Sequence, residues 1–332
     1  MNLTTGKKIF ISWAPYSRRS RSLSTDLNLE ACFIHYLKFQ RPAYSPFKYI
    51  LQAVHTLVLV LRKRPSIVFV QDPPIFATFF VYLYTLLTFG QARFVVDAHS
   101  GALTHPWWKP FRGLQKFLYR RAVTVITTNN ELAKLVKSWG ADSMALAGPP
   151  VKLCSGEVIQ LDGVFNMMLV NTFSIDEPLP VALDAVATIP DLHLYVTGDK
   201  SKAPQALLKS APPNVTFTDF LPDNGYINLM SSVDAVMVLT SEDFTLQLGA
   251  MEAVSLGKPV LTSDLTFLRE HFNRGTIHVP NTSEGVRQGI MELRQNLPRL
   301  SREILDLQRA HQEEWLVKSR RLHELVANGG VQ

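Results

Sequence analysis

Cysteine is scarce in this chain of 332 residues, which contains only Cys32 and Cys154. Two isolated cysteines give neither the paired spacing of a metal site nor the framework of a disulfide-stabilised secreted domain. We therefore expect no metal and no other bound cofactor, and the composition favours a reducing compartment.

Long hydrophobic runs are missing as well. The longest uncharged apolar run, Ile75 to Phe89, falls short of the roughly 20 residues that cross a bilayer, so we expect a buried helix there. The first residues, MNLTTGKKIFIS, lack the apolar stretch and the cleavage site of a signal peptide. Both observations favour a cytoplasmic location.

Charge is low and unevenly spread. Charged residues make up 19% of the chain and apolar residues 46%, so a chain of this length can bury the cores of two domains. The net charge of +6 arises partly from clusters that suit phosphate groups, an anionic membrane face or simply solvent. Because no nucleic-acid-binding module accompanies them, we expect no nucleic-acid partner. The clusters lie at residues 17–21, 62–64, 109–121 and 318–321.

Short runs rich in β-branched and aromatic residues alternate with segments of helical length in both halves of the chain. This alternation predicts α/β domains in which parallel strands carry helices on both faces. The strand-like runs of the first half are KIFISWA, CFIHYL, SIVFVQ, ARFVVDA and AVTVITT, and those of the second are FNMMLVNTF, HLYVTGD, NVTFTDF, AVMVLTS, PVLTSD and TIHVP.

The alternating series is interrupted once, after Gly148-Pro149-Pro150. We therefore predict two doubly wound Rossmann-like domains that face a central cleft. The predicted boundaries are 1–150 for the first domain, 151–164 for a linker, 165–300 for the second domain and 301–332 for an amphipathic helix that packs back on the first domain.

Loops that follow the strands bind ligands in such folds. The segment TSEDFTLQLGAMEAVSLGKPVLTSD, residues 240–264, follows one strand-like run. We predict a helix over residues 245–256, ended by Gly257, whose first amides would favour a phosphate. Glu252 would lie about 10 Å along this helix, where a carboxylate can accept hydrogen bonds from a ribose diol. A solvent-exposed glutamate is the simpler alternative.

This segment resembles the donor-nucleotide segment of GT-B glycosyltransferases, especially the family-4-like, mostly retaining enzymes. The order of elements is similar over nearly the whole chain, and specific motif similarity covers about residues 166–280. The resemblance implies a glycosyltransferase of the hexosyltransferase type. It would move a sugar from a nucleotide diphosphate sugar, such as a UDP-sugar, to an acceptor. The second domain would hold the donor, with Glu252 bound to its ribose, and the first domain would hold the acceptor. The matching residues are Glu252, Ala253, Gly257, Pro259 and Val260.

One position departs from the family pattern. The family's first glutamate falls on Phe244, which leaves Glu242 or Asp243 to replace it beside the transferred sugar. The Thr-x-Gln-x-Gly-Ala stretch also resembles a branch of bacterial polysaccharide-assembly glycosyltransferases. That likeness implies that Thr245 and Gln247 contact the diphosphate.

Other loops of the second domain resemble the family less closely. The family's Lys-Gly after the first strand is replaced by Asp176-Glu177-Pro178. Gly198 in LYVTGD would permit close approach of the nucleotide, and Lys200 or Lys202 would meet phosphate unless they form a solvated turn. The nucleobase would lie near residues 220–221.

In the first domain, WAPYSRRSRS stands where the family has a Gly-rich loop. Ser17, Arg18 and Arg19 offer hydroxyl and guanidinium donors to a diphosphate, or else form a surface cluster at a helix start. His99 resembles the family histidine beside the donor sugar, and Asp97 precedes it. For an inverting reaction either would be the general base, whereas for a retaining reaction His99 would only orient the sugar.

Basic and aromatic residues occur together in HPWWKPF at 105–111, in the aromatic run at 75–89 and at the basic end of the helix over 47–64. This composition fits peripheral contact with the inner face of a membrane and a lipid-linked or glycan acceptor. Core packing accounts for the aromatic residues equally well. The resemblance places the chemistry in cell-surface polysaccharide biosynthesis.

Two alternatives stay open. A nucleotide-sugar 2-epimerase has the same fold and similar ribose and phosphate contacts, but it needs more acid and base residues around the sugar. A non-catalytic glycosyltransferase-like partner subunit would keep the fold and tolerate Phe244 in place of the glutamate.

Overall fold

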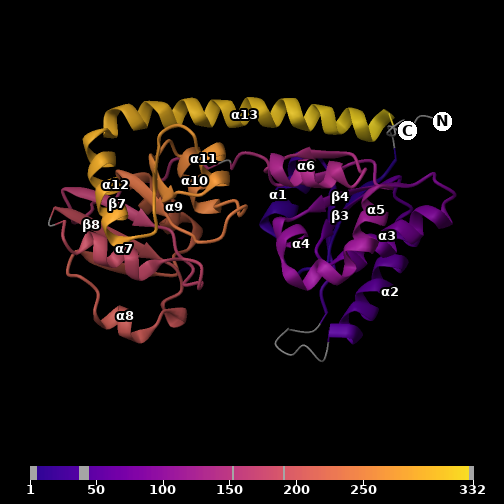
Figure 1. Cartoon of the computed structure of the whole chain (residues 1–332), viewed down its shortest axis with the longest axis horizontal. Coiled ribbons are helices and arrows are strands. Elements are labelled where there is room, and N and C mark those ends of the chain that lie inside the picture. Colours follow the sequence, from indigo (N-terminus) through magenta and orange to yellow (C-terminus); the bar gives the residue numbers. More distant parts are fainter. Residues whose placement is uncertain (1–5, 37–44, 152, 190, 329–332) are drawn as a thin grey trace. The chain divides into compact units, whose positions relative to one another are not determined.

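The computed structural model describes residues 6–36, 45–151, 153–189 and 191–328. The chain divides into two compact units: unit 1 comprises residues 1–149 and 314–332, and unit 2 comprises residues 150–313. Each unit holds one six-stranded sheet in which neighbouring strands pair in parallel (Figure 1). The predicted α/β fold with two Rossmann-like sheets is therefore confirmed.

The sheet of unit 1 has the strand order β2-β1-β3-β4-β5-β6. Its central strands are continuous apolar runs, as expected where helices cover both faces of a parallel sheet. The elements are β1 (Lys8–Ser12), α1 (Arg18–Asp26), β2 (Glu30–Phe33), α2 (Ser45–Lys63), β3 (Ile67–Asp72), α3 (Ile75–Leu87), β4 (Arg93–Ala98), α4 (Ser100–Thr104), the 3-10 helix η3 (Pro106–Phe111), α5 (Arg112–Tyr119), β5 (Val125–Thr127), α6 (Asn130–Ser138) and β6 (Ser143–Ala145).

The sheet of unit 2 has the order β12-β11-β10-β7-β8-β9. Two apolar cores flank it: helices α7 and α12 contribute to one, and helices α9, α10 and α11 contribute to the other. The elements are β7 (Phe165–Leu169), α7 (Leu179–Val186), β8 (Leu192–Thr197), η4 (Lys200–Lys202), α8 (Gln205–Lys209), β9 (Val215–Asp219), α9 (Asp223–Ser232), β10 (Ala235–Val238), α10 (Leu248–Ser255), β11 (Val260–Ser263), α11 (Thr266–His271), β12 (Thr276–Val279), α12 (Ser283–Gln295) and α13 (Leu297–Asn328).

Helix α13, labelled in Figure 1, begins in unit 2 and ends in unit 1. Its last turns carry Trp315, Leu322 and Val326, which are buried in the core of unit 1 together with Phe10 and Ile126. The end of α13 therefore completes a core whose other members come from the first 150 residues.

Two predicted element boundaries need correction. The strand expected at 32–37 is β2, which begins at Glu30 and ends at Phe33, and Leu37 lies outside the described residues. The helix expected from residue 245 begins only at Leu248. Phe244 has a left-handed backbone, with φ of 61°, and Gln247 is still extended, so the loop continues three residues further than its composition indicates.

The aromatic run at 75–89 forms helix α3, as predicted, but it is not buried throughout. Ile75 and Val81 are fully buried, whereas Leu86, Leu87 and Phe89 are exposed, Phe89 to 95%. Among the helices in the described part of the chain, none has both the length and the apolarity of a membrane span.

Glycine allows α12 to lie close against the sheet of unit 2. A Cβ atom on Gly289 would lie 2.2 Å from a methyl carbon of Val279, inside any permitted contact distance. Gly225, on α9, differs because its nearest neighbour would be 3.9 Å away, which is ordinary contact.

We expect Gly289→Ala to lower the free energy of unfolding by about 1–3 kcal/mol, because the added methyl group overpacks the interface between helix and strand. Gly225→Ala is the matched control in the same unit, and it should be neutral or stabilising by up to about 1 kcal/mol. Urea denaturation of both variants measures the difference. Equal stabilities would contradict the close approach of α12 to β12.

Candidate functional site

Strand β7 is the point at which the strand order of unit 2 switches direction. The chain adds β8 and β9 on one side of β7, and then adds β10, β11 and β12 on the other side. In open parallel sheets, ligands bind beyond the carboxyl ends of the strands at such a switch point. The loops that follow β7 and β10, residues 170–178 and 239–247, therefore outline the candidate site of unit 2.

Helix α10 starts at this edge of the sheet. The Met251 amide donates to the Gln247 carbonyl at 3.2 Å, so the amides of Leu248, Gly249 and Ala250 precede the first hydrogen bond within the helix. A Cβ on Gly249 would lie 2.7 Å from the Val170 side chain, and the glycine therefore lets the helix approach the end of β7. These amides and the helix dipole favour a negatively charged group.

Glu252 is buried on α10, with 6% of its surface exposed, so the alternative of a solvent-exposed glutamate is wrong. The hydroxyl of Tyr226, on α9, donates a hydrogen bond to Glu252 Oε2 at 2.7 Å. Because α10 starts at Leu248, the carboxylate lies only four residues, about 6 Å, along the axis. The predicted spacing of about 10 Å is therefore too long.

Thr240 fixes the start of the loop between β10 and α10. Its amide donates to Ser263 Oγ at 2.9 Å, its carbonyl accepts from Asn281 Nδ2 at 2.9 Å, and its hydroxyl donates to Asp176 Oδ2 at 2.9 Å. Asp176 also accepts the Ser241 amide at its carbonyl oxygen, at 2.7 Å. The two loops of the switch point are thus tied together before any ligand binds.

The three residues that compete for the place of the family glutamate have different surroundings. Asp243 Oδ1 accepts from the amides of Phe244, at 2.8 Å, and Phe267, at 3.3 Å, so this carboxylate serves the loop and the start of α11. Phe244 packs against the apolar core beside α10. Glu242 is exposed, as is Thr245, whereas Gln247 is half-buried. Of the two predicted carboxylates, Glu242 is therefore the one whose geometry still suits a ligand.

A carboxylate organises the loop after β7, where the family has a basic residue. Glu177 accepts the amides of Thr172, at 2.7 Å, and Ser174, at 3.1 Å, and the Thr172 hydroxyl at 3.0 Å. The replacement of the family's Lys-Gly is visible in the sequence, but the hydrogen bonds that Glu177 accepts were not predicted from it. A loop with several small polar residues before a glutamate could have indicated this internal capping.

Gly198 has a positive φ of 116°, and a Cβ there would lie 2.3 Å from the Asn171 carbonyl oxygen. The glycine therefore lets β8 approach the chain's own backbone after β7. Nζ of the predicted phosphate ligand Lys200 lies 3.6 Å from Asp219 Oδ2, and Lys202 Nζ lies 3.9 Å from Asp199 Oδ2. Both pairs fit the solvated-turn alternative.

A hydrogen-bonded group in unit 1 consists of Arg19, Asp97 and His99. Arg19 donates to Asp97 Oδ1 from Nε at 3.0 Å and from Nη2 at 2.8 Å, and His99 Nε2 lies 3.2 Å from Asp97 Oδ2. Burial raises the pKa of Asp97, but the charges of Arg19 and His99 outweigh it and hold this pKa at about 2. A fully buried carboxylate with such a low pKa is a poor proton acceptor, which argues against Asp97 as the general base.

Arg19 also donates to the carbonyl oxygens of Leu146 and Ala147. Four of its five N–H groups are thereby used inside unit 1, so its guanidinium has little capacity left for a diphosphate. Ser17 is the N-cap of α1 and accepts the Ser20 amide at 3.2 Å. The side chain of Arg18, the third predicted ligand here, lies outside the described part of the structure.

Asp72, at the end of β3, was missed by sequence reasoning. Its Oδ2 accepts from Tyr119 Oη at 2.6 Å and from Gln115 Nε2 at 3.1 Å, while its buried Oδ1 has no hydrogen-bond partner. Burial raises the pKa of Asp72 to about 6 even though these two hydrogen bonds lower it. The partners lie more than 40 residues away, so no local pattern could have shown this site.

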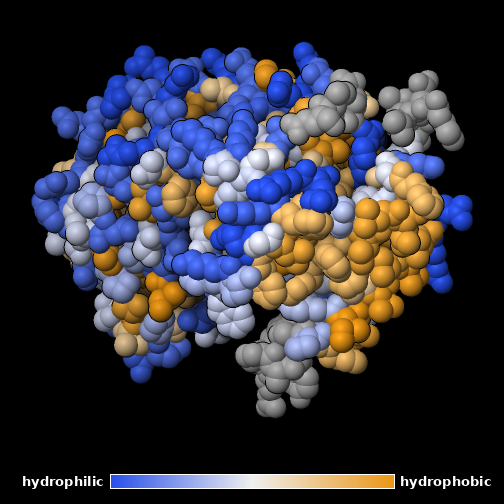
Figure 2. All heavy atoms as spheres, turned by 45° about the vertical axis from the view of Figure 1, so that its right-hand side comes forward, coloured by the Kyte–Doolittle hydropathy of each residue, from blue (hydrophilic) through white to orange (hydrophobic). Residues whose placement is uncertain are grey.

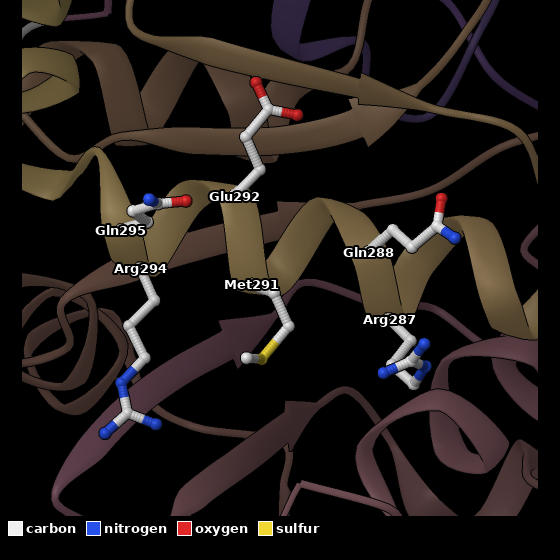
Figure 3. Close-up of a pocket in the computed structure, with 6 residues that line it drawn as sticks. All are labelled: Arg287, Gln288, Met291, Glu292, Arg294 and Gln295. Carbon is white, nitrogen blue, oxygen red and sulfur yellow. The ribbon is translucent and has the colours of Figure 1, made fainter.

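A hollow of about 590 Å³ lies along α12 between Arg287 and Gln295. Figure 3 shows the side chains that line it. All of its lining residues come from this one helix, and Glu292 points away from Met291 and Arg294. Arg294 lies 4.0 Å from Asp191, just before β8, and over the ring of Phe165, the first residue of β7. The Arg294 end of the hollow is thus at the amino edge of the sheet, and none of the lining residues belongs to the loops of the switch point, so we do not regard the hollow as the functional site.

Metal ligation has no visible basis in residues 6–36, 45–151, 153–189 and 191–328, where no group of three His, Cys, Asp or Glu side chains could hold an ion. The absence of a cofactor stays a prediction.

Residues 170–296 match the family model described as glycosyl transferases group 1. A glycosyltransferase from Rickettsia africae has the same fold, with a TM-score of 0.71 and 14% identity over 98% of both chains. Anabaena HepE, solved in complex with UDP, gives 0.70 and 12% over 97% of this chain and 100% of its own. A putative UDP-N-acetylglucosamine 2-epimerase from Listeria monocytogenes gives 0.59 and 14% over 91% of both chains.

A search of curated protein sequences finds no significant match to this chain. The family match and the shared folds nevertheless confirm the resemblance to GT-B glycosyltransferases. The finer likeness to family-4-like enzymes is consistent with them.

We expect Asp72→Asn to change the pH dependence of stability. The folded-state pKa of Asp72, about 6, lies above its unfolded value of 3.8, so the wild type loses stability as the pH rises through this window. Asparagine does not titrate, so the stability of the variant relative to wild type should rise by about 2 kcal/mol between pH 4 and pH 7.

Urea denaturation at both pH values measures this difference. Asp142→Asn, an exposed position in the same unit, is the control, and its difference should change far less. A relative stability of Asp72→Asn that is independent of pH would contradict the raised pKa.

Proposed function

We propose that this chain is a glycosyltransferase of the hexosyltransferase type that transfers a sugar from a nucleotide diphosphate sugar to an acceptor. The observation that carries the proposal is the buried Glu252, hydrogen-bonded to Tyr226 and one turn beyond the open amides of α10. This combination lies within the segment that matches the group 1 glycosyltransferases. It offers a carboxylate to a ribose diol and amides to a diphosphate in one helix.

The leaving diphosphate gains negative charge as the bond to the sugar breaks. In our proposal the amides at residues 248–250 stabilise that charge, because they are already oriented before the reaction. Thr245 and Gln247 precede these amides and can donate hydrogen bonds to the same group. Asp176-Glu177-Pro178 stand where the family has Lys-Gly, so the backbone has a larger share of this task.

His99 is our candidate for the sugar-facing residue of unit 1. A hydrogen bond from its Nε2 to Asp97 leaves Nδ1 as the ring nitrogen that can accept a proton or a hydroxyl hydrogen bond. Asp97 then acts as a positioning residue, held by Arg19. For a retaining reaction this pair would orient the sugar, and for an inverting reaction His99 would be the general base.

UDP is the first nucleotide to test, because HepE, which has the same fold, was solved in complex with UDP. For the acceptor we propose a lipid-linked or polysaccharide precursor in cell-surface polysaccharide assembly, and for the location a cytoplasmic enzyme at the inner face of the membrane. The basic and aromatic surface of unit 1 supports both.

Incubation with a panel of UDP-sugars and membrane lipid extract tests the activity directly. We expect release of UDP that depends on the lipid and is matched by sugar in the lipid fraction. Interconversion of the nucleotide sugar without release would favour the 2-epimerase instead. Absence of both turnover and UDP binding would favour the non-catalytic partner.

We expect Glu252→Gln to weaken UDP binding by about 30- to 150-fold. The amide loses one acceptor for the ribose diol, and a hydrogen bond to a charged group is worth about 2–3 kcal/mol. Titration calorimetry with UDP measures the change. Glu292→Gln in the hollow of Figure 3 is the matched control, and it should bind UDP like wild type.

Tyr226→Phe removes only the hydroxyl that holds Glu252, and we expect UDP to bind about fivefold more weakly, the equivalent of about 1 kcal/mol. Unchanged binding by Glu252→Gln would remove the ribose assignment. A loss in Glu292→Gln comparable to that in Glu252→Gln would move the site to α12.

A further inference from the structure

Helix α2 buries several polar residues on its inward face. Gln52 and Thr56 are fully buried, and Lys48 is only 6% exposed. One side of the helix exposes apolar residues at the spacing of successive turns. These exposed residues are Phe47, Ile50, Val54, Val58 and Leu61.

Two hydrogen bonds on the buried face of α2 fix its orientation. Gln52 Nε2 donates to the Ile34 carbonyl oxygen at 2.7 Å, and Trp13 Nε1 donates to Thr56 Oγ1 at 2.8 Å. Turning the helix to bury its apolar stripe would break both bonds and leave buried polar groups unpaired, which is costly. The stripe is therefore held outward by the fold.

The apolar surface continues onto neighbouring elements. Helix α2 packs against α3, α3 packs against α5, and α5 contacts η3. These elements add six further exposed apolar side chains. Figure 2 shows a broad orange area on the face that comes forward, the side on which Figure 1 draws α2 and α3. The additional residues are Leu86, Leu87, Phe89, Trp107, Phe111 and Phe117.

The same stretch of chain is strongly basic. Residues 31–130 contain twelve lysines and arginines but only two carboxylates, Asp72 and Asp97, and both are buried. The chain as a whole has a net charge of only +6, so positive charge is concentrated in this part. The acid that precedes the stretch, Glu30, is paired with Lys7 and Lys63.

We propose that this face, defined by the exposed apolar residues of α2, the end of α3, η3 and the Phe117 turn of α5, docks onto an anionic lipid bilayer. Apolar side chains would enter the interface, Trp107 would lie at headgroup depth, and the flanking cations would contact anionic headgroups. Its role in bringing the enzyme to a lipid-linked acceptor rests on the proposed function.

Charge favours a membrane over a second copy of the chain as the occupant. In a two-fold dimer the same patch would meet itself, and the exposed cations of this stretch, among them Arg62 and Lys109, would be brought towards their own copies. Like charges brought together at an interface are destabilising. An anionic bilayer complements both the apolar centre and the positive surroundings.

Sedimentation with vesicles in which about a third of the lipid is phosphatidylglycerol and the rest phosphatidylcholine tests the proposal. We expect binding that falls steeply with added salt and is at least tenfold weaker on phosphatidylcholine alone. Arg62→Gln with Lys109→Gln should weaken binding by about fivefold for each charge removed.

The triple variant Ile50→Gln, Val54→Gln and Leu61→Gln tests the apolar part and should lose at least tenfold in binding. Leu316→Gln with Val317→Gln changes exposed apolar residues of α13 in the same unit, and this control should bind like wild type. Circular dichroism and the thermal unfolding midpoint confirm that each variant is folded.

Equal vesicle binding by the triple variant and wild type would overturn the proposal. So would a wild-type dimer in sedimentation velocity that the triple variant abolishes without any change in vesicle binding, because that result assigns the face to a second copy. The vesicle assay contains no nucleotide sugar, so failure of the proposed function leaves its outcome unaffected. Conversely, the triple variant should bind UDP like wild type.

Discussion

Parallel pairing of strands is the constraint on which the rest of this structure depends. It sends every chain crossing back over a face of the sheet and brings all carboxyl ends to one edge, so polar residues separated by many positions in sequence meet there. In unit 2 the edge gathers Asp176, Thr240 and the start of α10. In unit 1 it brings Arg19 to Asp97, 78 residues away in sequence.

Several charged groups at these edges are already paired or hydrogen-bonded within the chain. Arg19 is used by Asp97 and two carbonyl oxygens, Glu177 by the loop after β7, and Asp243 by two amides. This internal pairing fixes the loops without a ligand, which reduces the ordering cost of binding. It also limits which groups can contact a substrate. Those groups lie at helix starts and loop tips, and they are not the charged residues that stand out in the sequence.

The fold was predictable because strand-like and helical runs alternate clearly, and because Glu252 lies among small residues followed by Gly257. The site was only partly predictable. A helix from residue 245 fits the composition, but the left-handed Phe244 postpones its start. Asp97 resembles a base until Arg19, 78 residues away, supplies its counter-charge. The environment of Asp72 depends on Tyr119 in the same way. Such pairings are set by topology and leave no mark in local sequence.

Helix α2 also shows how little a local sequence pattern reveals about the surroundings of a residue. Its periodic apolar residues would ordinarily be assigned to the core, since periodicity identifies a stripe but not the direction in which it faces. Here Gln52 and Thr56 decide the direction, because buried donors and acceptors must find partners and these two find Ile34 and Trp13. A few satisfied polar contacts thus hold a large apolar surface in solvent. These polar contacts are made within one chain, and the hydrophobic gain of the exposed surface is realised only when something apolar covers it.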